Sequence, residues 1–105
     1  MNKNKSSVLH REAGHKGEFY IESESDESKV ATLSYSRAGD AKIIIDHTEV
    51  DESLRGTGTG EELVSSAVSW ARENKLTVLP LCPFANAVIR KHPEYQDVLQ
   101  NNTSS

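Results

Sequence analysis

The sequence predicts a small α+β domain with the element order β-β-β-α-β-α. Three consecutive segments between residues 18 and 50 show the two-residue alternation of strands, and residues 60–74 then change to helical spacing. The chain has 105 residues, of which 35% are apolar, so there is room for one domain with one modest core.

The three predicted strands span residues 18–24, 29–36 and 42–50. Polar turn residues separate them, namely Ser25-Asp26-Glu27-Ser28 and Ala38-Gly39-Asp40. Strands joined by such short turns pair in sequence order, so this region predicts an antiparallel three-strand meander.

A helix is predicted over residues 60–74, followed by a strand and a second helix. The apolar residues of the first helix recur at helical spacing: Leu63, Val64, Ala67, Val68, Trp70 and Ala71. Residues 76–82 form a short apolar run in which Pro80 indicates an edge strand. The second helix covers residues 84–91 and ends at His92-Pro93.

The two ends of the chain are polar and lack periodicity. We expect residues 1–16 to form a flexible arm, residues 17–99 to form the domain, and residues 100–105 to be a disordered tail.

Composition excludes several classes of function. The net charge of −4 argues against a general nucleic-acid binder, and no apolar stretch approaches the length of a membrane span. Cys82 is the single cysteine, which excludes an internal disulfide and a multi-cysteine metal site, so we expect no metal. A reducing, cytoplasmic location follows from the cysteine usage and from the lack of an apolar signal core at the start.

The most informative segment is Arg55-Gly56-Thr57-Gly58-Thr59-Gly60, between a predicted strand and a predicted helix. A glycine-rich loop that opens a helix directs several N–H groups at one point, where the helix dipole adds partial positive charge. Such a loop binds phosphate whatever the net charge, and Arg55 would add a fixed cation. The alternative is a loop that merely turns the chain.

Three phosphate-binding motifs can be compared with this loop. A Walker loop requires Lys after its last glycine, whereas Glu61 follows Gly60. A dinucleotide fingerprint requires one more residue before its third glycine and many further strands. The acetyltransferase signature Arg/Gln-x-x-Gly-x-Gly/Ala matches residues 55–60 at every position.

Over residues 17–99 the chain resembles the GCN5-related N-acetyltransferase superfamily, in its minimal, YjdJ-like form. The likeness rests on His47-Thr48-Glu49-Val50, Leu54-Arg55-Gly56-x-Gly58, Trp70-Ala71-Arg72-Glu73-Asn74, Pro80-Leu81-Cys82-Pro83-Phe84 and His92-Pro93-Glu94-Tyr95. The resemblance implies acetyl-coenzyme A as the acyl donor. Loop 55–60 would then hold its pyrophosphate, the strand ending at Val50 would pair with the pantetheine arm, and the gap between strands 42–50 and 76–82 would admit the thioester.

Two departures from the family pattern affect the expected chemistry. Larger members have extra N-terminal elements that wall the acceptor site, and we expect most of that wall to be missing here because residues 1–17 are polar and lack periodicity. Many also carry a tyrosine in the last helix that protonates the leaving thiolate, and here Val88 lies near that position. The resemblance therefore implies cofactor binding more strongly than catalysis.

Few residues can carry the chemistry. His47 and Glu49 alternate onto one face late in the third strand and could serve as base and orienting carboxylate, or simply be solvated. Cys82 could act as acyl acceptor or proton donor, or be a buried apolar residue. Asn86 and Arg90 are candidates for cofactor contact from the last helix, with Arg90 or Lys91 meeting the adenosine phosphate; the alternative is plain surface charge.

Two functional hypotheses remain open at this stage. The first is an enzyme that transfers an acetyl group from acetyl-coenzyme A to an amine, either a small molecule or an exposed protein lysine. The second is a non-catalytic acyl-coenzyme A-binding or regulatory module. For either we expect a monomer or weak dimer with no nucleic-acid or membrane partner.

Overall fold

A computed structural model of the chain describes residues 8–22, 29–54 and 56–99. Its elements follow in the order β1 (Leu9–Ala13), β2 (Lys16–Glu22), β3 (Lys29–Arg37), β4 (Lys42–Val50), the 3-10 turn η1 (Glu52–Leu54), α1 (Thr59–Glu73), β5 (Thr77–Pro80), α2 (Pro83–Lys91) and the 3-10 turn η2 (Pro93–Val98). The predicted α+β class and the helix–strand–helix order after the meander are confirmed.

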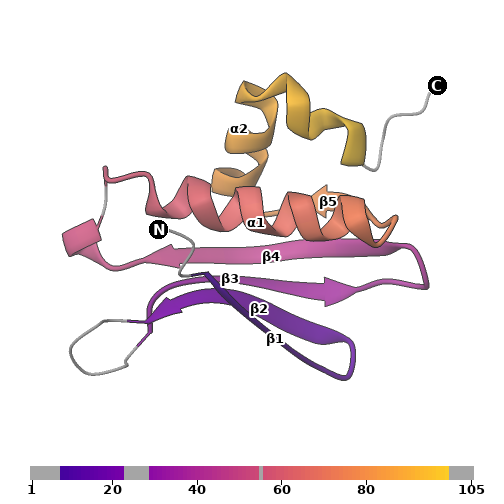
Figure 1. Cartoon of the computed structure of the whole chain (residues 1–105), viewed down its shortest axis with the longest axis horizontal. Helices are drawn as coiled ribbons and strands as arrows, with labels where there is room; N and C mark the ends of the chain where they lie inside the picture. Colours follow the sequence, from indigo (N-terminus) through magenta and orange to yellow (C-terminus); the bar gives the residue numbers. More distant parts are fainter. Residues whose placement is uncertain (1–7, 23–28, 55, 100–105) are drawn as a thin grey trace.

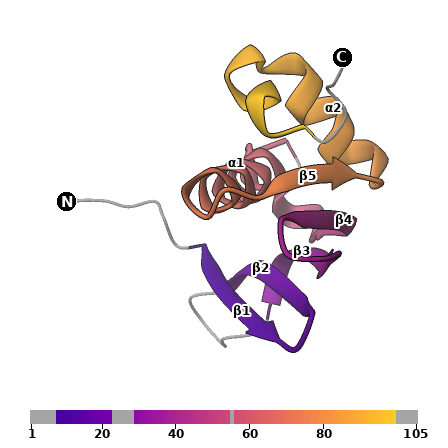
Figure 2. The same cartoon turned by 90° about the vertical axis from the view of Figure 1, so that its right-hand side faces the viewer.

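The strands form one sheet in the order β1-β2-β3-β4-β5. Neighbours from β1 to β4 are antiparallel, whereas β5 runs parallel to β4, as expected for strands joined through a helix. Helix α1 lies along one face of the sheet, and α2 lies near β5, the strand at one edge of the sheet (Figures 1 and 2).

The core lies between α1 and the inward side chains of β3 and β4. Along β3 the predicted alternation holds, because Ala31, Leu33 and Tyr35 are buried and the residues between them are half-exposed. The fully buried residues that meet there are Leu33, Tyr35, Ile43, Ile45, Leu63, Val64, Ala67, Val68 and Ala71. Residues at helical spacing on α1 thus cover residues at strand spacing, which is the pairing that the sequence pattern predicts.

The expectation that residues 1–16 form a flexible arm is wrong for residues 9–16. Residues 9–13 form strand β1, which pairs with β2 from Leu9 opposite Tyr20 to Ala13 opposite Lys16, so the meander has four strands. All five β1 residues are exposed. Because neither face of this edge strand is buried, its sequence shows no alternation of apolar and polar residues that would indicate a strand. Residues 1–7 and the predicted tail 100–105 lie outside the described residues.

Contacts between rings attach β1 to the rest of the molecule. The His10 ring stacks on Phe19 at a centroid distance of 4.2 Å and meets Trp70 of α1 edge-on at 4.7 Å. The Tyr35 hydroxyl lies 2.5 Å from His10 Nε2 and donates to Glu12 at 3.1 Å. These contacts join residues far apart in the chain, which explains why local patterns did not indicate the strand.

Candidate coenzyme A site

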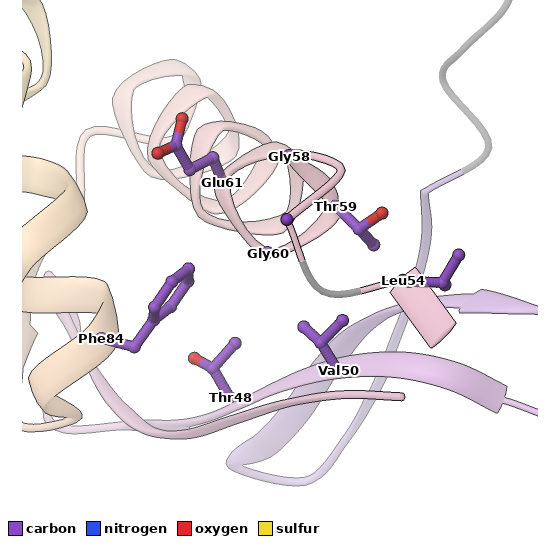
Figure 3. A pocket seen from close by; sticks show the side chains of 9 residues that line it. Thr48, Val50, Leu54, Gly58, Thr59, Gly60, Glu61 and Phe84 are labelled. Atoms are coloured by element: carbon purple, nitrogen blue, oxygen red, sulfur yellow. The ribbon is translucent and has the colours of Figure 1, made fainter. Parts of the chain in front are cut away.

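A cleft of about 620 Å³ opens between β4, the loop before α1 and the start of α2 (Figure 3). Its lining consists of Thr48, Val50, Leu54, Gly56, Gly58, Thr59, Gly60, Glu61 and Phe84. It therefore combines apolar walls with the beginning of a helix, a combination suited to a long ligand with one anionic end.

The cleft exists because β4 and β5 separate partway along their length. Their pairing runs from Lys42 opposite Thr77 to Ile45 opposite Pro80. The N–H groups of Leu81 and Cys82 then both donate to the Ile45 carbonyl, at 3.1 and 3.2 Å, and the chain turns away into α2. The predicted gap between the two strands is confirmed.

A bulge in β4 lies at the same place. Ser34 pairs with His47 while its neighbour Tyr35 pairs with Ile45, so Asp46 is an extra residue in the ladder. The bulge shifts the alternation of β4, and Thr48, opposite buried Leu33, points to the helix side and lines the cleft.

The glycines of the loop differ in what they do. Gly56 and Gly58 have φ values of +84° and +87°, which side-chain-bearing residues rarely adopt, and a Cβ on either would meet no atom within 4 Å. Gly60 has no such φ, but a Cβ there would lie 2.6 Å from the Phe84 ring. The first two shape the turn, and the third lets α1 approach α2.

The beginning of α1 fits an anion. The first N–H groups of a helix have no partner within the helix, and Gly58, at the N-cap, supplies no side-chain acceptor for them. Thr57 has a structural part, because its hydroxyl donates to the Leu54 carbonyl at 2.5 Å and lies 2.7 Å from the Thr59 hydroxyl. Arg55, the cation expected beside the phosphates, lies outside the described residues.

Cys82 is the N-cap residue of α2 and is buried. Its thiol donates to the Thr48 hydroxyl at 3.4 Å. Burial raises the pKa of this thiol. The deprotonated sulfur, however, accepts hydrogen bonds from the Thr48 hydroxyl and from the backbone of Ala85 and Phe84, and these outweigh burial, so the pKa lies below its ordinary value. Cys82 thus adjoins the cleft wall in a setting that favours the thiolate.

His47 and Glu49 lie elsewhere. They pair with Ser34 and Thr32 and so face away from the side to which Thr48 points. His47 Nε2 lies 3.1 Å from Glu49 Oε2, with side chains 63% and 71% exposed. They line a separate hollow of about 520 Å³. The residue that contacts the Cys82 thiol is therefore Thr48 and not His47.

The two α2 residues expected to contact the cofactor, Asn86 and Arg90, do not line the cleft. Arg90 donates from Nε to Asn86 Oδ1 at 3.2 Å. Phe84 is the α2 residue in the lining, and Lys91 reaches Glu61 at the start of α1 at 3.0 Å. Val88, near the family's tyrosine position, is buried.

Sequence reasoning missed Thr48, Leu54, Glu61 and Phe84. Thr48 could have been found only from the bulge, and Phe84 only from its contact with Gly60, 24 residues earlier in the chain. In the described part of the chain, no group of three or more His, Cys, Asp or Glu side chains could hold a metal ion. None of the described helices is long and apolar enough to cross a membrane.

Comparison with known proteins identifies the family. The family model of the GCN5-related N-acetyltransferases matches residues 18–98. The structure of a GCN5-like candidate N-acetyltransferase from Staphylococcus aureus is 32% identical, with 94% of each chain covered and a TM-score of 0.69. No curated protein matches the sequence.

More distant structures show the same fold. Tetrahymena GCN5 is 10% identical over 87% of this chain and 64% of its own, with a TM-score of 0.59. A candidate streptothricin acetyltransferase from Bacillus anthracis, solved with acetyl-coenzyme A, is 16% identical over 65% of this chain and 39% of its own, with a TM-score of 0.53. The family match and the Staphylococcus likeness show that this chain belongs to the GCN5-related N-acetyltransferase family.

Proposed function

We propose that this protein binds acetyl-coenzyme A in the cleft and transfers the acetyl group to an amine. The observation that carries the proposal is the coincidence of three features at one place. These are the gap between β4 and β5, the uncapped start of α1, and the two left-handed glycines before it. Family membership supports the same ligand.

The ligand's parts match the parts of the cleft. The pyrophosphate would accept hydrogen bonds from N–H groups at the start of α1, around Gly58. The pantetheine arm would run along β4 past Val50, where β5 no longer pairs with that strand. The thioester would then lie near Thr48 and Cys82, at the inner end of the cleft.

The setting of Cys82 favours transfer through the cysteine. Its thiolate would attack the acetyl carbonyl, the bond from that carbonyl to the sulfur of coenzyme A would break, and coenzyme A would leave as a thiolate of similar basicity. The amine would then attack the Cys82 thioester, forming the amide, releasing the cysteine thiolate and giving up its proton to solvent or a base. This route needs no tyrosine acid, which agrees with a buried Val88 near that position.

His47 and Glu49 face away from Thr48 and Cys82, so we propose that they serve the acceptor amine from the other face of the sheet, at the gap where β5 no longer pairs with β4. Their 3.1 Å contact lets the carboxylate orient the imidazole, and both side chains face solvent, where an amine can approach. An acceptor site so exposed suits the lysine of a protein better than an enclosed metabolite. The cytoplasmic location and the monomeric or weakly dimeric state stay predictions.

Mass spectrometry after incubation with acetyl-coenzyme A tests the proposal. We expect free coenzyme A to appear and one acetyl group to be found on Cys82, with transfer to an added amine or lysine peptide. If Cys82→Ala transfers acetyl to amines at the parent's rate, direct transfer replaces the cysteine route. The buried Val88 near the tyrosine position is equally compatible with a second candidate, a binding module without turnover. Tight coenzyme A binding with neither labelling nor amine acetylation would establish that candidate.

A further inference from the structure

Charged groups from both helices meet at the rim of the cleft. Lys91 Nζ, at the end of α2, lies 3.0 Å from Glu61 Oε2, and Nε2 of the next residue, His92, lies 3.9 Å from Glu61 Oε1. His92 Nδ1 also lies 3.4 Å from Glu94 Oε2. Glu61 belongs to the cleft lining, and Figure 3 shows its carboxylate on the side of α1 that faces α2. The Glu61–Lys91 pair therefore bridges the helices beside the proposed phosphate position.

The Glu61 carboxylate lies where its negative charge would weaken the binding of an anionic ligand. The hydrogen bond from Lys91 is the main cause that holds the pKa of Glu61 below its ordinary value, so Glu61 is ionised at neutral pH. A carboxylate and a phosphate a few ångströms apart repel each other by about 1 kcal/mol or more, even in a watery cleft. Glu61 therefore repels the same phosphate that the N–H groups at the start of α1 attract.

Lys91 is free to change partners. Its side chain is 63% exposed and that of Glu61 is 43% exposed, and ion pairs this exposed contribute at most about 1 kcal/mol. A lysine carries its charge on a flexible four-carbon stem, so a small rotation carries the ammonium from one acceptor to another. A phosphate group near it would be the stronger acceptor because it carries more charge.

We propose that Lys91 is a phosphate-binding residue of the cofactor site, and that Glu61 holds it at the rim until a phosphate replaces the carboxylate. Glu61 then sets the affinity by competing with the ligand for Lys91 and by repelling it, while His92 stays beside Glu61. This inference rests on the proposed coenzyme A site and adds to it a residue and a competitor that the glycine loop does not supply.

The two partners of the pair should act in opposite directions on affinity. Lys91→Met should weaken coenzyme A binding about tenfold, since a charge-assisted contact is lost. Glu61→Gln should tighten it about threefold, since repulsion and competition are both removed. Neither variant should change the affinity for pantetheine, which carries no phosphate. Dephospho-coenzyme A, which keeps the pyrophosphate but lacks the adenosine phosphate, tells which phosphate is involved. If Lys91→Met weakens its binding as much as it weakens the binding of coenzyme A, Lys91 contacts the pyrophosphate.

Matched controls remove the effect of net charge. Asp97→Asn removes a carboxylate from a similarly exposed ion pair, with Arg72 at 2.7 Å, that lies outside the cleft lining. Lys75→Met removes an exposed lysine beyond the opposite end of α1. Both should bind coenzyme A like the parent. Affinities are measured by calorimetry for coenzyme A and by amide NMR titration for pantetheine.

The outcomes separate this inference from the function on which it rests. Opposite shifts for coenzyme A with unchanged pantetheine binding support it. Unchanged coenzyme A affinity in both variants, weaker binding in Glu61→Gln, or equal changes for both ligands would overturn it while leaving the cofactor site intact. If the parent protein binds no coenzyme A at all, the proposed function itself fails, and this inference with it.

Discussion

At the scale of single residues, glycine does three different things in this protein. Gly58 provides a left-handed turn, Gly60 lets α1 approach Phe84, and Gly17 leaves room for the Tyr35 ring, which would lie 2.4 Å from a Cβ placed there. The first is visible in the sequence because a turn is local. The other two depend on a partner distant in the chain and appear only in the folded molecule.

Gly58→Val should weaken coenzyme A binding at least about tenfold, or 1.4 kcal/mol. A β-branched residue cannot keep a φ of +87°, so the loop must rearrange and its N–H groups lose their common direction. Gly39→Val, at +74° in the turn between β3 and β4, is the matched control with the same strain away from the cleft. Calorimetry on both folded variants measures their affinities for coenzyme A. Equal affinities of the two variants would contradict the assignment of this loop to the phosphates.

Thr48→Val should shift the pH profile of Cys82 acetylation to higher pH. The Thr48 hydrogen bond helps to hold the pKa of the thiol down, so its loss raises that pKa and leaves less thiolate at a fixed neutral pH. Thr32→Val, on the opposite face of the sheet, should leave the profile in place. An unshifted profile in Thr48→Val would mean that this contact does not activate the cysteine.

At the scale of elements, the sequence predicts those that carry their own periodicity. Helix α1 and strands β3 and β4 are found within a residue or two, because their buried faces repeat at helical or strand spacing. Strand β1 is missed because it is an exposed edge whose contacts come from Phe19, Tyr35 and Trp70. The bulge at Asp46 is missed for a similar reason, since only the pairing with β3 defines it.

Removing residues 1–13 should lower the melting temperature by at least about 5 °C. The truncation deletes a paired strand and uncovers the ring of Phe19, on which His10 stacks. Removing residues 1–7 alone is the control, since it keeps all of β1. Melting followed by circular dichroism measures both, and equal melting temperatures would show that β1 adds nothing to stability.

His10 should make stability depend on mildly acidic pH. Burial is the main cause that lowers the pKa of His10, opposed by nearby Glu12 and assisted by Arg37. The folded state therefore binds fewer protons than the unfolded state just below pH 6.5, and stability falls as the pH drops through that window. His10→Phe keeps a ring on Phe19 and should flatten this dependence. Denaturant melts at several pH values test it, and equal slopes in parent and variant would exclude His10.

At the scale of the whole molecule, the cofactor site is local. The net charge of −4 does not attract an anion, so the affinity must come from a helix start, a glycine loop and one or two cations. The loop and the strand gap could be predicted because they follow the family's linear motifs. Which cation of α2 reaches the start of α1 could not be predicted, because Lys91 meets Glu61 across 30 residues of chain, whereas Arg90 bonds to Asn86 within its own helix.

The most direct test of the central claim is an amide NMR titration of the protein with coenzyme A. The account predicts that the largest shifts follow the cleft, at Thr48 to Val50, at Gly56 to Glu61 and at Phe84, with small changes in the β1–β2 hairpin. Saturating shifts confined to the hairpin, or no shifts at millimolar coenzyme A, would contradict the assignment of the cleft as the cofactor site.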